Sequence, residues 1–367
     1  MACAPRSFDL GEFSIEFIGR LPSKRSLSGA VADAVEGSDA ILVFAMRAIG
    51  DFVRSHTLVR LLRERYPSRP IDIVGRAPAI ELASFMEGVR SGIAEPFGKS
   101  CLHLSRRVAF AKQLRGRYRT VYVISRSWKA ALVPFLAGIP ERIGWFGEFR
   151  YPLVNRPRFG DLRMPRMVDR LGGLGCSASE PRTSWPAPRL ICTPETLARW
   201  RQRSGEAPAP RTIIGMAPSS SDVNKNWPPE RYAALALWAT ARGMDVWLLG
   251  GHADKAIVDQ VRRMAGRHVR DMTDSSLAES TYRVAAADIF VGNDSGLLHI
   301  AAALGKPSVG IFTSTRPFIA APINSQARVV IPPADQVHRT FSTPHAPDFE
   351  TVREAVEDAL EEHRNFG

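Results

Sequence analysis

The chain has 367 residues, 45% of them hydrophobic, which is enough to bury two cores, so two domains are expected. No apolar run approaches the roughly 18 residues of a membrane span, and residues 1–38 lack the continuous apolar stretch of a signal peptide. No C-x-x-C pair occurs, so free thiols in a reducing cytosol are expected in place of zinc sites or disulfides at Cys3, Cys101, Cys176 and Cys192.

The net charge of +12 is unevenly distributed. Residues 105–170 contain 15 Lys/Arg against 4 Asp/Glu. Such a segment fits a nucleic acid, an anionic lipid or an acidic small substrate, but no aromatic RNA-binding motif and no zinc-finger spacing accompanies it. Codon bias is a further explanation, because arginine greatly outnumbers lysine throughout the chain.

The first half alternates between apolar strands and helices after an N-terminal extension at residues 1–38. This alternation predicts a parallel sheet with helices on both faces, in a Rossmann-like domain over residues 39–176. The strands are expected at 41–46, 71–74 and 120–124, and the helices at 52–65, 104–115 and 128–137. A linker rich in Pro, Ser and Thr is expected at residues 177–211.

The alternation restarts in the second half and predicts another Rossmann-like domain over residues 212–345, followed by a C-terminal helix within 346–367. Neither half carries G-x-G-x-x-G after its first strand or a G-x-x-x-x-G-K-(S/T) loop. The main sequence evidence for a dinucleotide oxidoreductase or a P-loop enzyme is therefore missing. The strands are expected at 212–217, 245–249, 289–291 and 307–312. The helices are expected at 229–242, 255–265, 277–286, 297–304 and 349–363.

A turn of small and hydroxylated residues, Gly292-Asn-Asp-Ser-Gly296, joins a predicted strand to a predicted helix. Backbone N–H groups at the N-terminus of a helix are free to bind phosphate. Asp294 and Ser295 can cap this helix, and His299 falls on its first turn. For Ser-Gly alone, an ordinary helix cap is the simpler interpretation.

The longer stretch from Asp294 to Phe312 resembles the signature of glycosyltransferase family 9. That signature is D-(S/T)-G-x-x-H-x-A-A-A-L followed by P-x-V-x-(L/I/V/Y)-(F/Y)-G-x-(T/S), and Thr313 stands where it usually has glycine. The resemblance implies an α/β protein of the GT-B class, with two Rossmann-like parallel-sheet domains facing a cleft. It also implies inverting sugar transfer, with Asp294, Ser295, Gly296 and His299 binding the nucleotide-sugar donor.

Asp51 ends a glycine turn that follows the first apolar strand. A carboxylate at this place can cap a helix, or it can take the proton of an acceptor hydroxyl as the sugar carbon is attacked. The residue alone leaves both roles open. The resemblance implies the second, with Asp51 as the catalytic base.

Lys225-Asn-Trp-Pro228 resembles the K-x-W-P motif of the same family. An ammonium here can neutralise charge on a departing diphosphate, with hydroxyls from Ser220 and Ser221 as further donors. A solvated loop lysine is the alternative, but the chain has only seven lysines. The resemblance further implies that Asp254 contacts the ribose, although an N-cap role is the simpler interpretation of that residue.

Residues 127–151 fit the pattern S-x-K-x-A-L-V-P-F-x-A-G-I-P-x-R-x-G-W-x-G-E-x-R-Y, which is similar to the heptosyltransferase II group of lipopolysaccharide core synthesis. The similarity implies acceptor contacts from Arg126, Ser127 and Lys129, beyond the carboxyl end of a strand. A helix start is the alternative for these three. For Trp145 and Arg150 a structural role in a turn at 144–147 is favoured.

The resemblance implies ADP-heptose as donor, the anionic inner core of a lipopolysaccharide precursor as acceptor, and no cofactor. We expect a cytoplasmic monomer in peripheral contact with the inner membrane, and no nucleic-acid partner. The sequence has no D-x-D pair and no His/carboxylate cluster with the spacing of a metal site, so no metal is predicted. Lys225 and the N-terminus of the helix at Ser295 would instead supply positive charge to the diphosphate. Two alternatives stay open: another core-sugar transferase, similar to heptosyltransferase I or III, and a non-catalytic GT-B-like protein that binds sugar nucleotides.

Overall fold

A computed structural model describes residues 39–98, 102–176, 184–206, 211–332 and 346–366. The predicted extension at 1–38 lies outside the described residues, as do Cys3 and Cys101. Of the four cysteines, Cys176 and Cys192 lie within the described residues, and neither is in a disulfide there. In the described part of the chain, no helix is both long and apolar enough to span a bilayer.

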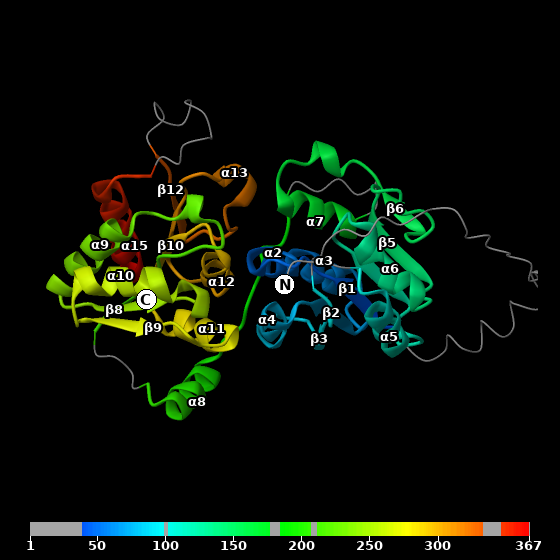
Figure 1. Ribbon diagram of the computed structural model, residues 1–367, viewed down its shortest axis with the longest axis horizontal. Helices are drawn as coiled ribbons and strands as arrows, with labels where there is room; N and C mark the ends of the chain where they lie inside the picture. The colour runs from blue at the N-terminus through cyan, green and yellow to red at the C-terminus, as the bar shows by residue number, and fades with distance from the viewer. Residues whose placement is uncertain (1–38, 99–101, 177–183, 207–210, 333–345, 367) are drawn as a thin grey trace, which may run out of the picture. The chain divides into compact units, whose positions relative to one another are not determined.

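The first half contains a six-stranded sheet with the order β3-β2-β1-β4-β5-β6, and every neighbouring pair is parallel (Figure 1). Its central strands are buried, which explains their continuous apolar sequences. The strands are β1 (Ile41–Phe44), β2 (Ile71–Gly75), β3 (Ser91–Ala94), β4 (Thr120–Val123), β5 (Glu141–Trp145) and β6 (Arg156–Arg158).

Helices lie on both faces of this sheet, and one of them differs from its prediction. The helix predicted at 52–65 is two helices that meet at Ser55, whose hydroxyl donates to the Asp51 carbonyl (2.8 Å). The first begins at Ile49, so Asp51 lies in its first turn. The helices are α2 (Ile49–Arg54), α3 (His56–Arg65), α4 (Ala77–Ile80), η1 (Glu81–Phe85), α5 (Leu104–Leu114), α6 (Trp128–Leu136), η2 (Asp161–Arg163) and α7 (Met167–Gly175).

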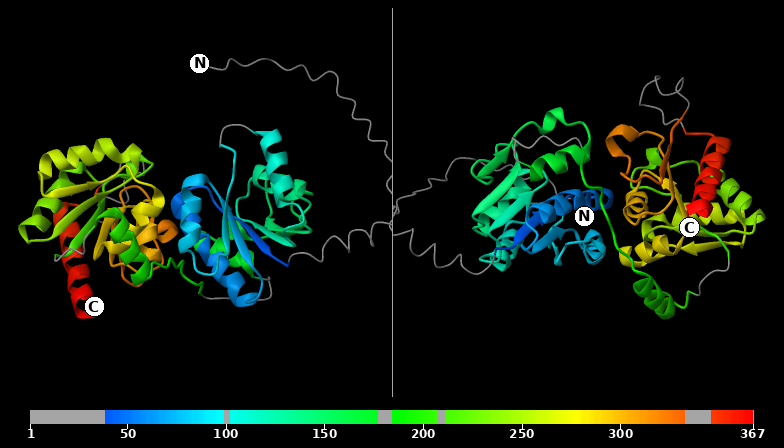
Figure 2. Two further views of the ribbon diagram at one scale, coloured as in Figure 1. Left: turned by 90° about the horizontal axis from the view of Figure 1, so that it is seen from below. Right: turned by 180° about the vertical axis from the view of Figure 1, so that it is seen from behind.

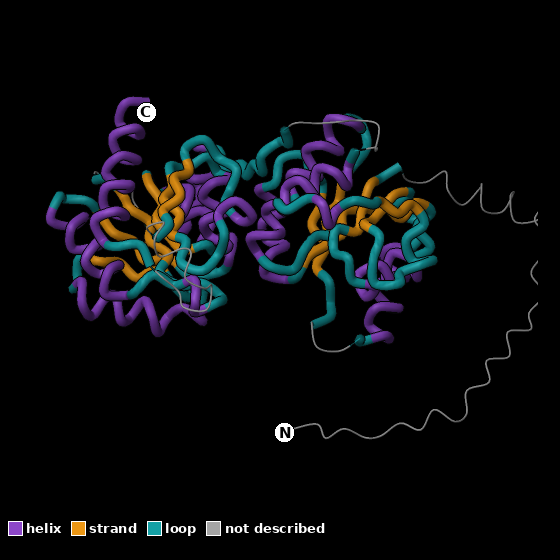
Figure 3. Tube along the Cα trace, turned by 90° about the horizontal axis from the view of Figure 1, so that it is seen from above, coloured by secondary structure: helices purple, strands orange, loops and turns teal. Residues whose placement is uncertain are grey.

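The second half contains another six-stranded parallel sheet, with the order β12-β11-β10-β7-β8-β9. Figures 2 and 3 show its strands with helices around them. Two parallel sheets confirm the predicted α/β fold, and β9 and β12 are strands that the sequence analysis missed. The strands are β7 (Ile213–Ala217), β8 (Asp245–Leu249), β9 (Val269–Met272), β10 (Ile289–Asn293), β11 (Ser308–Ile311) and β12 (Ala327–Val330).

The helices of the second half follow the predicted pattern closely, and the final helix buries Val352, Val356 and Leu360 on its apolar face. The helices are η3 (Val223–Lys225), α9 (Pro229–Ala241), η4 (His252–Asp254), α10 (Lys255–Ala265), α11 (Leu277–Ala286), α12 (Gly296–Ala303), α13 (Pro317–Ala320) and α15 (Phe349–Phe366).

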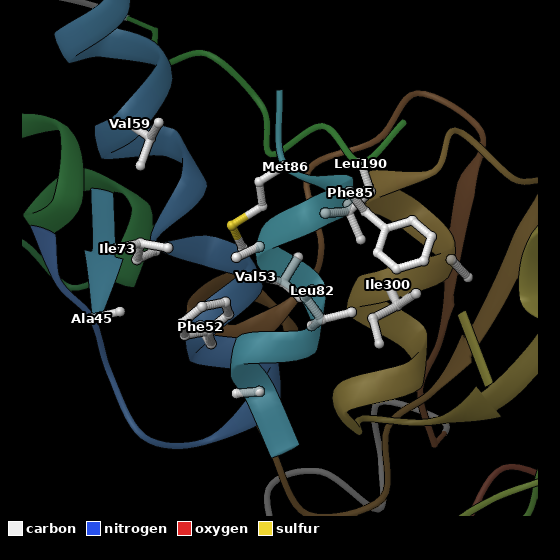
Figure 4. Close-up of a cluster of buried hydrophobic side chains, with 14 of the residues drawn as sticks. Ala45, Phe52, Val53, Val59, Ile73, Leu82, Phe85, Met86, Leu190 and Ile300 are labelled. Carbon is white, nitrogen blue, oxygen red and sulfur yellow. The ribbon is translucent and has the colours of Figure 1, made fainter. Parts of the chain in front are cut away.

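The predicted linker contains ordered structure. It includes the helix α8 (Pro194–Ser204), and before it the Leu190 N–H donates to the Ala303 carbonyl (2.8 Å) and the Ile191 N–H to the Phe85 carbonyl (2.7 Å). Leu190 therefore lies in an apolar cluster with Phe85 of η1 and Ile300 of α12 (Figure 4). The domain boundaries at 39–176 and 212–345 stay predictions.

Candidate active site

The turn between β10 and α12 carries a buried ionic cluster. Lys225 Nζ lies 2.7 Å from Asp294 Oδ2, and His299 Nε2 lies 3.7 Å from Asp294 Oδ1. The second distance is beyond hydrogen-bond range, so His299 interacts with the carboxylate electrostatically. The fold therefore brings together three residues that the sequence analysis selected from two separate motifs.

Burial and neighbouring charges fix the protonation states in this cluster. Burial lowers the pKa of His299; Asp294 opposes this effect, and the nearby Arg54 guanidinium adds to it. Burial alone would raise the pKa of Asp294, but His299 and Lys225 hold it well below its usual range. At neutral pH the cluster thus contains a neutral imidazole and an ionised carboxylate.

The N-terminus of α12 is not capped as predicted. Ser295 occupies the N-cap position in an extended conformation, but its side chain makes no capping hydrogen bond, and its Oγ is buried without a partner among the described residues. The Asp294 carboxylate faces Lys225 and His299. The capping prediction for Asp294 and Ser295 is therefore wrong, and a buried hydroxyl lies at the first turn of a helix, where anions bind.

Asn293 holds the loop that carries Lys225. Its buried Oδ1 accepts from the Trp227 N–H (2.9 Å) and from the Tyr232 hydroxyl (3.1 Å). On the other side of the loop, the Thr313 hydroxyl donates to the Asn224 carbonyl (2.7 Å). The side chain at Thr313, the position where the family signature usually has glycine, thus supports the Lys225 loop.

Ser220, Ser221 and Asp254 lie on loops that follow neighbouring strands. Ser220 Oγ donates to the Asp222 carbonyl (2.6 Å), and Ser221 is exposed. Asp254 Oδ2 accepts from the Gly251 N–H (2.7 Å), which is a capping contact. The strands β10, β7 and β8 are parallel neighbours. The loops that follow β7 and β8, and the turn after β10 that carries Asp294, therefore lie at the carboxyl edge of one sheet, where open α/β sheets bind ligands.

Asp51 is positioned on the first turn of α2 and is paired with Arg54. The distance from Arg54 Nη2 to Asp51 Oδ1 is 2.6 Å, and Arg54 Nη1 also donates to the Ala320 carbonyl of α13 (3.4 Å). The sequence analysis missed Arg54, although its i,i+3 spacing from Asp51 on a helix is a usable signal.

Two glycines let α2 approach α12. A Cβ at Gly50 would lie 2.6 Å from His299 Cδ2, and a Cβ at Gly296 would lie 2.7 Å from Ile49 Cγ2. This contact places Asp51, one residue after Gly50, beside the helix of the ionic cluster. A cavity of about 370 Å³ adjoins it, lined by Arg54, His299, Val53, Thr57, Ala302 and Phe318 among others, and its volume is that of a small-molecule site.

Arg126, Ser127 and Lys129 follow the carboxyl end of β4, the neighbour of β1. Ser127 Oγ caps α6 by accepting from the Lys129 N–H (3.2 Å). The Arg126 guanidinium lies 3.2 Å from Asp161 Oδ2. Within the described residues the Lys129 ammonium has no carboxylate partner. Any role in acceptor binding stays a prediction for all three.

Trp145 and Arg150 have the structural role that was favoured. Both are buried; Trp145 Nε1 donates to the Arg170 carbonyl (3.2 Å), and Arg150 donates to the carbonyls of Ser125 and Trp145. Burial lowers the pKa of Arg150 to about 10. Gly144 and Trp145 lie in β5, so the predicted turn begins two residues later than expected.

Comparison with known proteins identifies the family. Residues 107–346 match glycosyltransferase family 9 (heptosyltransferase), over more than half of the chain. The chain belongs to this family. Lipopolysaccharide heptosyltransferase 2 of Escherichia coli K12 is 33% identical over 310 residues, which cover 79% of this chain and 87% of that protein. Lipooligosaccharide heptosyltransferase 2 of Haemophilus ducreyi is 31% identical over 305 residues, covering 79% and 88%.

The solved structure of E. coli ADP-heptose lps heptosyltransferase II has the same fold as this family 9 chain. The TM-score is 0.79 at 28% identity, covering 89% of this chain and 99% of that one. The predictions of the family, the GT-B fold and a glycosyltransferase activity in lipopolysaccharide core synthesis are confirmed. Among the described residues of this glycosyltransferase, no group of three or more His, Cys, Asp or Glu side chains could hold a metal ion.

Proposed function

We propose that this glycosyltransferase moves L-glycero-D-manno-heptose from ADP-heptose to the inner-core heptose of a lipopolysaccharide precursor, with inversion at the sugar carbon. The observation that carries the proposal is the contact of α2 with α12, which brings Asp51 beside the Lys225–Asp294–His299 cluster. The similarity to heptosyltransferase 2 enzymes supports the choice of sugar. A protein that only bound sugar nucleotides would not need both groups at one junction.

The donor diphosphate is proposed to bind at the start of α12. Three kinds of group there favour negative charge: the backbone N–H groups, the Ser295 hydroxyl, which has no partner within the described residues, and the Lys225 ammonium, which pairs with Asp294. Lys225 would exchange Asp294 for a phosphate oxygen as charge develops on the leaving ADP. Ser220 and Ser221 would add hydroxyl donors, and Asp254 would bind the ribose through the oxygen that does not cap Gly251.

The acceptor hydroxyl is proposed to lie between Asp51 and the donor sugar. Asp51 takes its proton, the hydroxyl oxygen bonds to the anomeric carbon, and the bond from that carbon to the diphosphate breaks. Because Arg54 occupies Oδ1 of Asp51, Oδ2 is the oxygen that receives the proton. Arg126, Ser127 and Lys129 would hold the anionic part of the acceptor.

The proposal includes no metal and no cofactor, because Lys225 and the α12 terminus can carry the diphosphate charge. We further propose that the protein is a monomer and that it works at the cytoplasmic face of the inner membrane, where its lipid-linked acceptor would be made. A homologous core transferase with a different sugar or acceptor is the alternative.

A donor and acceptor panel tests the proposal. The purified protein is incubated in EDTA with ADP-heptose or other sugar nucleotides, and with lipopolysaccharide precursors that carry no heptose or one. Mass spectrometry then follows the lipid product. We expect one added heptose, only from ADP-heptose and only on the precursor that already has a heptose. Transfer to the heptose-free precursor, or transfer from another sugar nucleotide but not from ADP-heptose, would contradict this proposal. Either result would favour the function of a homologous transferase.

A further inference from the structure

Five large apolar side chains are exposed on two loops of the first half. Phe149 is fully exposed at 100%, and the exposed fractions of Leu162, Phe159, Tyr151 and Phe146 are 75%, 65%, 59% and 42%. Soluble monomers rarely expose such side chains together, and a contiguous patch usually marks an interaction site. We refer to Phe146, Phe149, Tyr151, Phe159 and Leu162 as the aromatic surface.

Three rings of the aromatic surface form one contiguous cluster. The Phe146 ring centroid lies 5.2 Å from that of Tyr151 and 5.1 Å from that of Phe159. Phe146 directly follows β5 and Phe159 directly follows β6, and these strands are parallel neighbours at one edge of the sheet (Figure 1). The side chains therefore gather where two adjacent strands end.

Packing of the fold does not account for Phe146 and Phe149. Within the same loop, Trp145 and Arg150 are buried and hydrogen-bonded, whereas Phe146 and Phe149 occupy positions that the sequence pattern leaves unspecified. The backbone at Glu148 and Phe149 has positive φ values of 46° and 48°. This conformation is unfavourable for a bulky side chain, so the loop holds Phe149 in solvent at an energetic cost.

Positive charge surrounds the aromatic surface. Arg156 and Arg163 are exposed and Arg158 is half-buried, and none of the three has a carboxylate partner within the described residues. The carboxylates nearby are engaged: Asp161 pairs with Arg126, and Glu148 Oε2 accepts from the Trp128 N–H (3.1 Å). An apolar apex with unpaired guanidinium groups around it is complementary to an anionic bilayer.

We propose that the aromatic surface docks this enzyme on an anionic lipid bilayer, with its rings among the headgroups and Arg156, Arg158 and Arg163 on the lipid phosphates. Aromatic side chains favour the headgroup region because their rings are apolar and tolerate nearby water. A protein partner would need a shaped surface, whereas rings projecting from two loops can enter lipid without one.

Docking would bring the proposed acceptor segment to the membrane. Arg126 Nη2 donates to the Phe146 carbonyl (3.3 Å), so residues 126–129 are joined directly to the aromatic surface. The sugars of a lipid-linked acceptor would then emerge beside this segment. This consequence rests on the proposed function, but bilayer binding itself is measurable without donor or acceptor.

Co-sedimentation with vesicles tests the proposal on the full chain. The vesicles contain phosphatidylcholine alone or with about 30% phosphatidylglycerol, an anionic charge density in the biological range. We expect binding to the anionic vesicles that weakens with added salt. Phe149→Ser with Phe159→Ser should reduce it about ten-fold or more, the effect of withdrawing a buried ring. Arg156→Gln with Arg163→Gln should reduce it roughly five-fold per charge.

Matched variants in the second half control for general loss of apolarity or charge. Leu237→Ser with Met264→Ser removes exposed apolar side chains from α9 and α10, and Arg263→Gln with Arg267→Gln removes two exposed charges. These variants should bind like the wild type. All variants should keep the wild-type rate with a lipid-free acceptor fragment, which separates docking from the proposed chemistry.

Two results would overturn the proposal. One is the absence of wild-type binding to anionic vesicles, or equal binding by the Phe149→Ser, Phe159→Ser variant. The other is a dimer in analytical ultracentrifugation that this variant abolishes, because the aromatic surface would then be an interface between two copies of the chain.

Discussion

Two neighbours position Lys225: Asp294 pairs with its ammonium group, and Asn293 holds its loop. The ionic contact is 2.7 Å long and partly buried, and the Asn293 amide fixes the backbone two residues further on. Such an ammonium is held in place before a diphosphate arrives, which lowers the cost of reorganisation during the reaction.

Lys225→Ala should therefore weaken both donor binding and catalysis. We expect kcat to fall by roughly 10²–10³, the usual effect of removing one electrostatic contact to the transition state. Steady-state kinetics and calorimetry with ADP measure the two effects. Lys225→Arg should recover part of the activity. Lys255→Ala is the matched control, because Lys255 of α10 forms an ion pair with Asp271 of β9. Unchanged kcat in Lys225→Ala would remove this residue from the donor site.

At the scale of single residues, the sequence motifs predicted several residues of the candidate site but not which residues contact one another within it. Asp51, Lys225 and His299 were predicted because their spacing matches known motifs. Asn293 was missed because its role depends on a contact with Trp227, distant in the sequence, that one sequence does not reveal. Arg54 was missed because the helix was predicted to begin at residue 52, after Asp51, so the two were not expected on one helix.

Secondary-structure elements were predicted well where apolar periodicity was long. The bounds of α10 and α11 were obtained directly, because each is an amphipathic helix between clear turn residues. The strands β3 and β6 were missed, since they are short, exposed edge strands with little apolar pattern. The break between α2 and α3 was missed because it depends on one serine hydroxyl.

The contact between α2 and α12 depends on Gly50. Gly50→Ala would place a methyl group 2.6 Å from His299 Cδ2, so the two helices must separate or His299 must move. We expect a loss of about 1–3 kcal/mol in the free energy of unfolding, as for other overpacked sites, together with reduced kcat. Denaturant unfolding and kinetics check both. Gly98→Ala is the control, because a Cβ there meets nothing closer than 4.0 Å. Equal stability and activity in the two variants would contradict the role of this contact.

The start of α3 is fixed by a neutral histidine. His56 Nδ1 accepts from the Arg189 N–H (2.9 Å), so its Nε2 must donate to the Glu87 carbonyl (2.7 Å). Burial lowers the pKa of His56 to about 4, and a proton on Nδ1 would face the Arg189 N–H.

Stability should consequently fall in mild acid. The contribution of His56 is fully present above its ordinary pKa of 6.5 and is lost as the pH falls toward 4. The free energy of unfolding should drop by about 2 kcal/mol between pH 7 and pH 5 through this group alone. Unfolding curves of the wild type and His56→Gln measure it. An equally steep pH dependence in both proteins would show that another group is responsible.

For the whole molecule, the charge distribution differs between the two halves. The surplus of basic residues at 105–170 belongs to the half with the proposed acceptor segment, and the Lys225–Asp294–His299 cluster, the proposed diphosphate site, belongs to the other half. Composition alone indicated an anionic partner, but it could not distinguish an acceptor from a membrane. The structure adds that some of these arginines are buried or paired, such as Arg150 and Arg126.

Arg126→Ala with Lys129→Ala should raise the KM for the lipid acceptor and leave ADP affinity unchanged. Added salt should weaken acceptor binding in the wild type more than in this variant, because exposed charges are screened beyond about 8 Å at physiological ionic strength. Arg263→Ala with Arg267→Ala, in the other half, is the matched control. A variant that lost ADP binding and kept acceptor binding would reverse the assignment of the two halves.

The central claim is that Asp51, at the junction of α2 and α12, is the base of heptose transfer. The measurement is the rate of transfer from ADP-heptose to a precursor ending in one heptose, by the wild type and by Asp51→Asn, with Asp259→Asn as a surface control. We predict active wild-type and control proteins, and a rate about 10²–10⁴ lower in Asp51→Asn with unchanged donor affinity, since an amide cannot accept the proton. Near-normal turnover by Asp51→Asn would contradict the account.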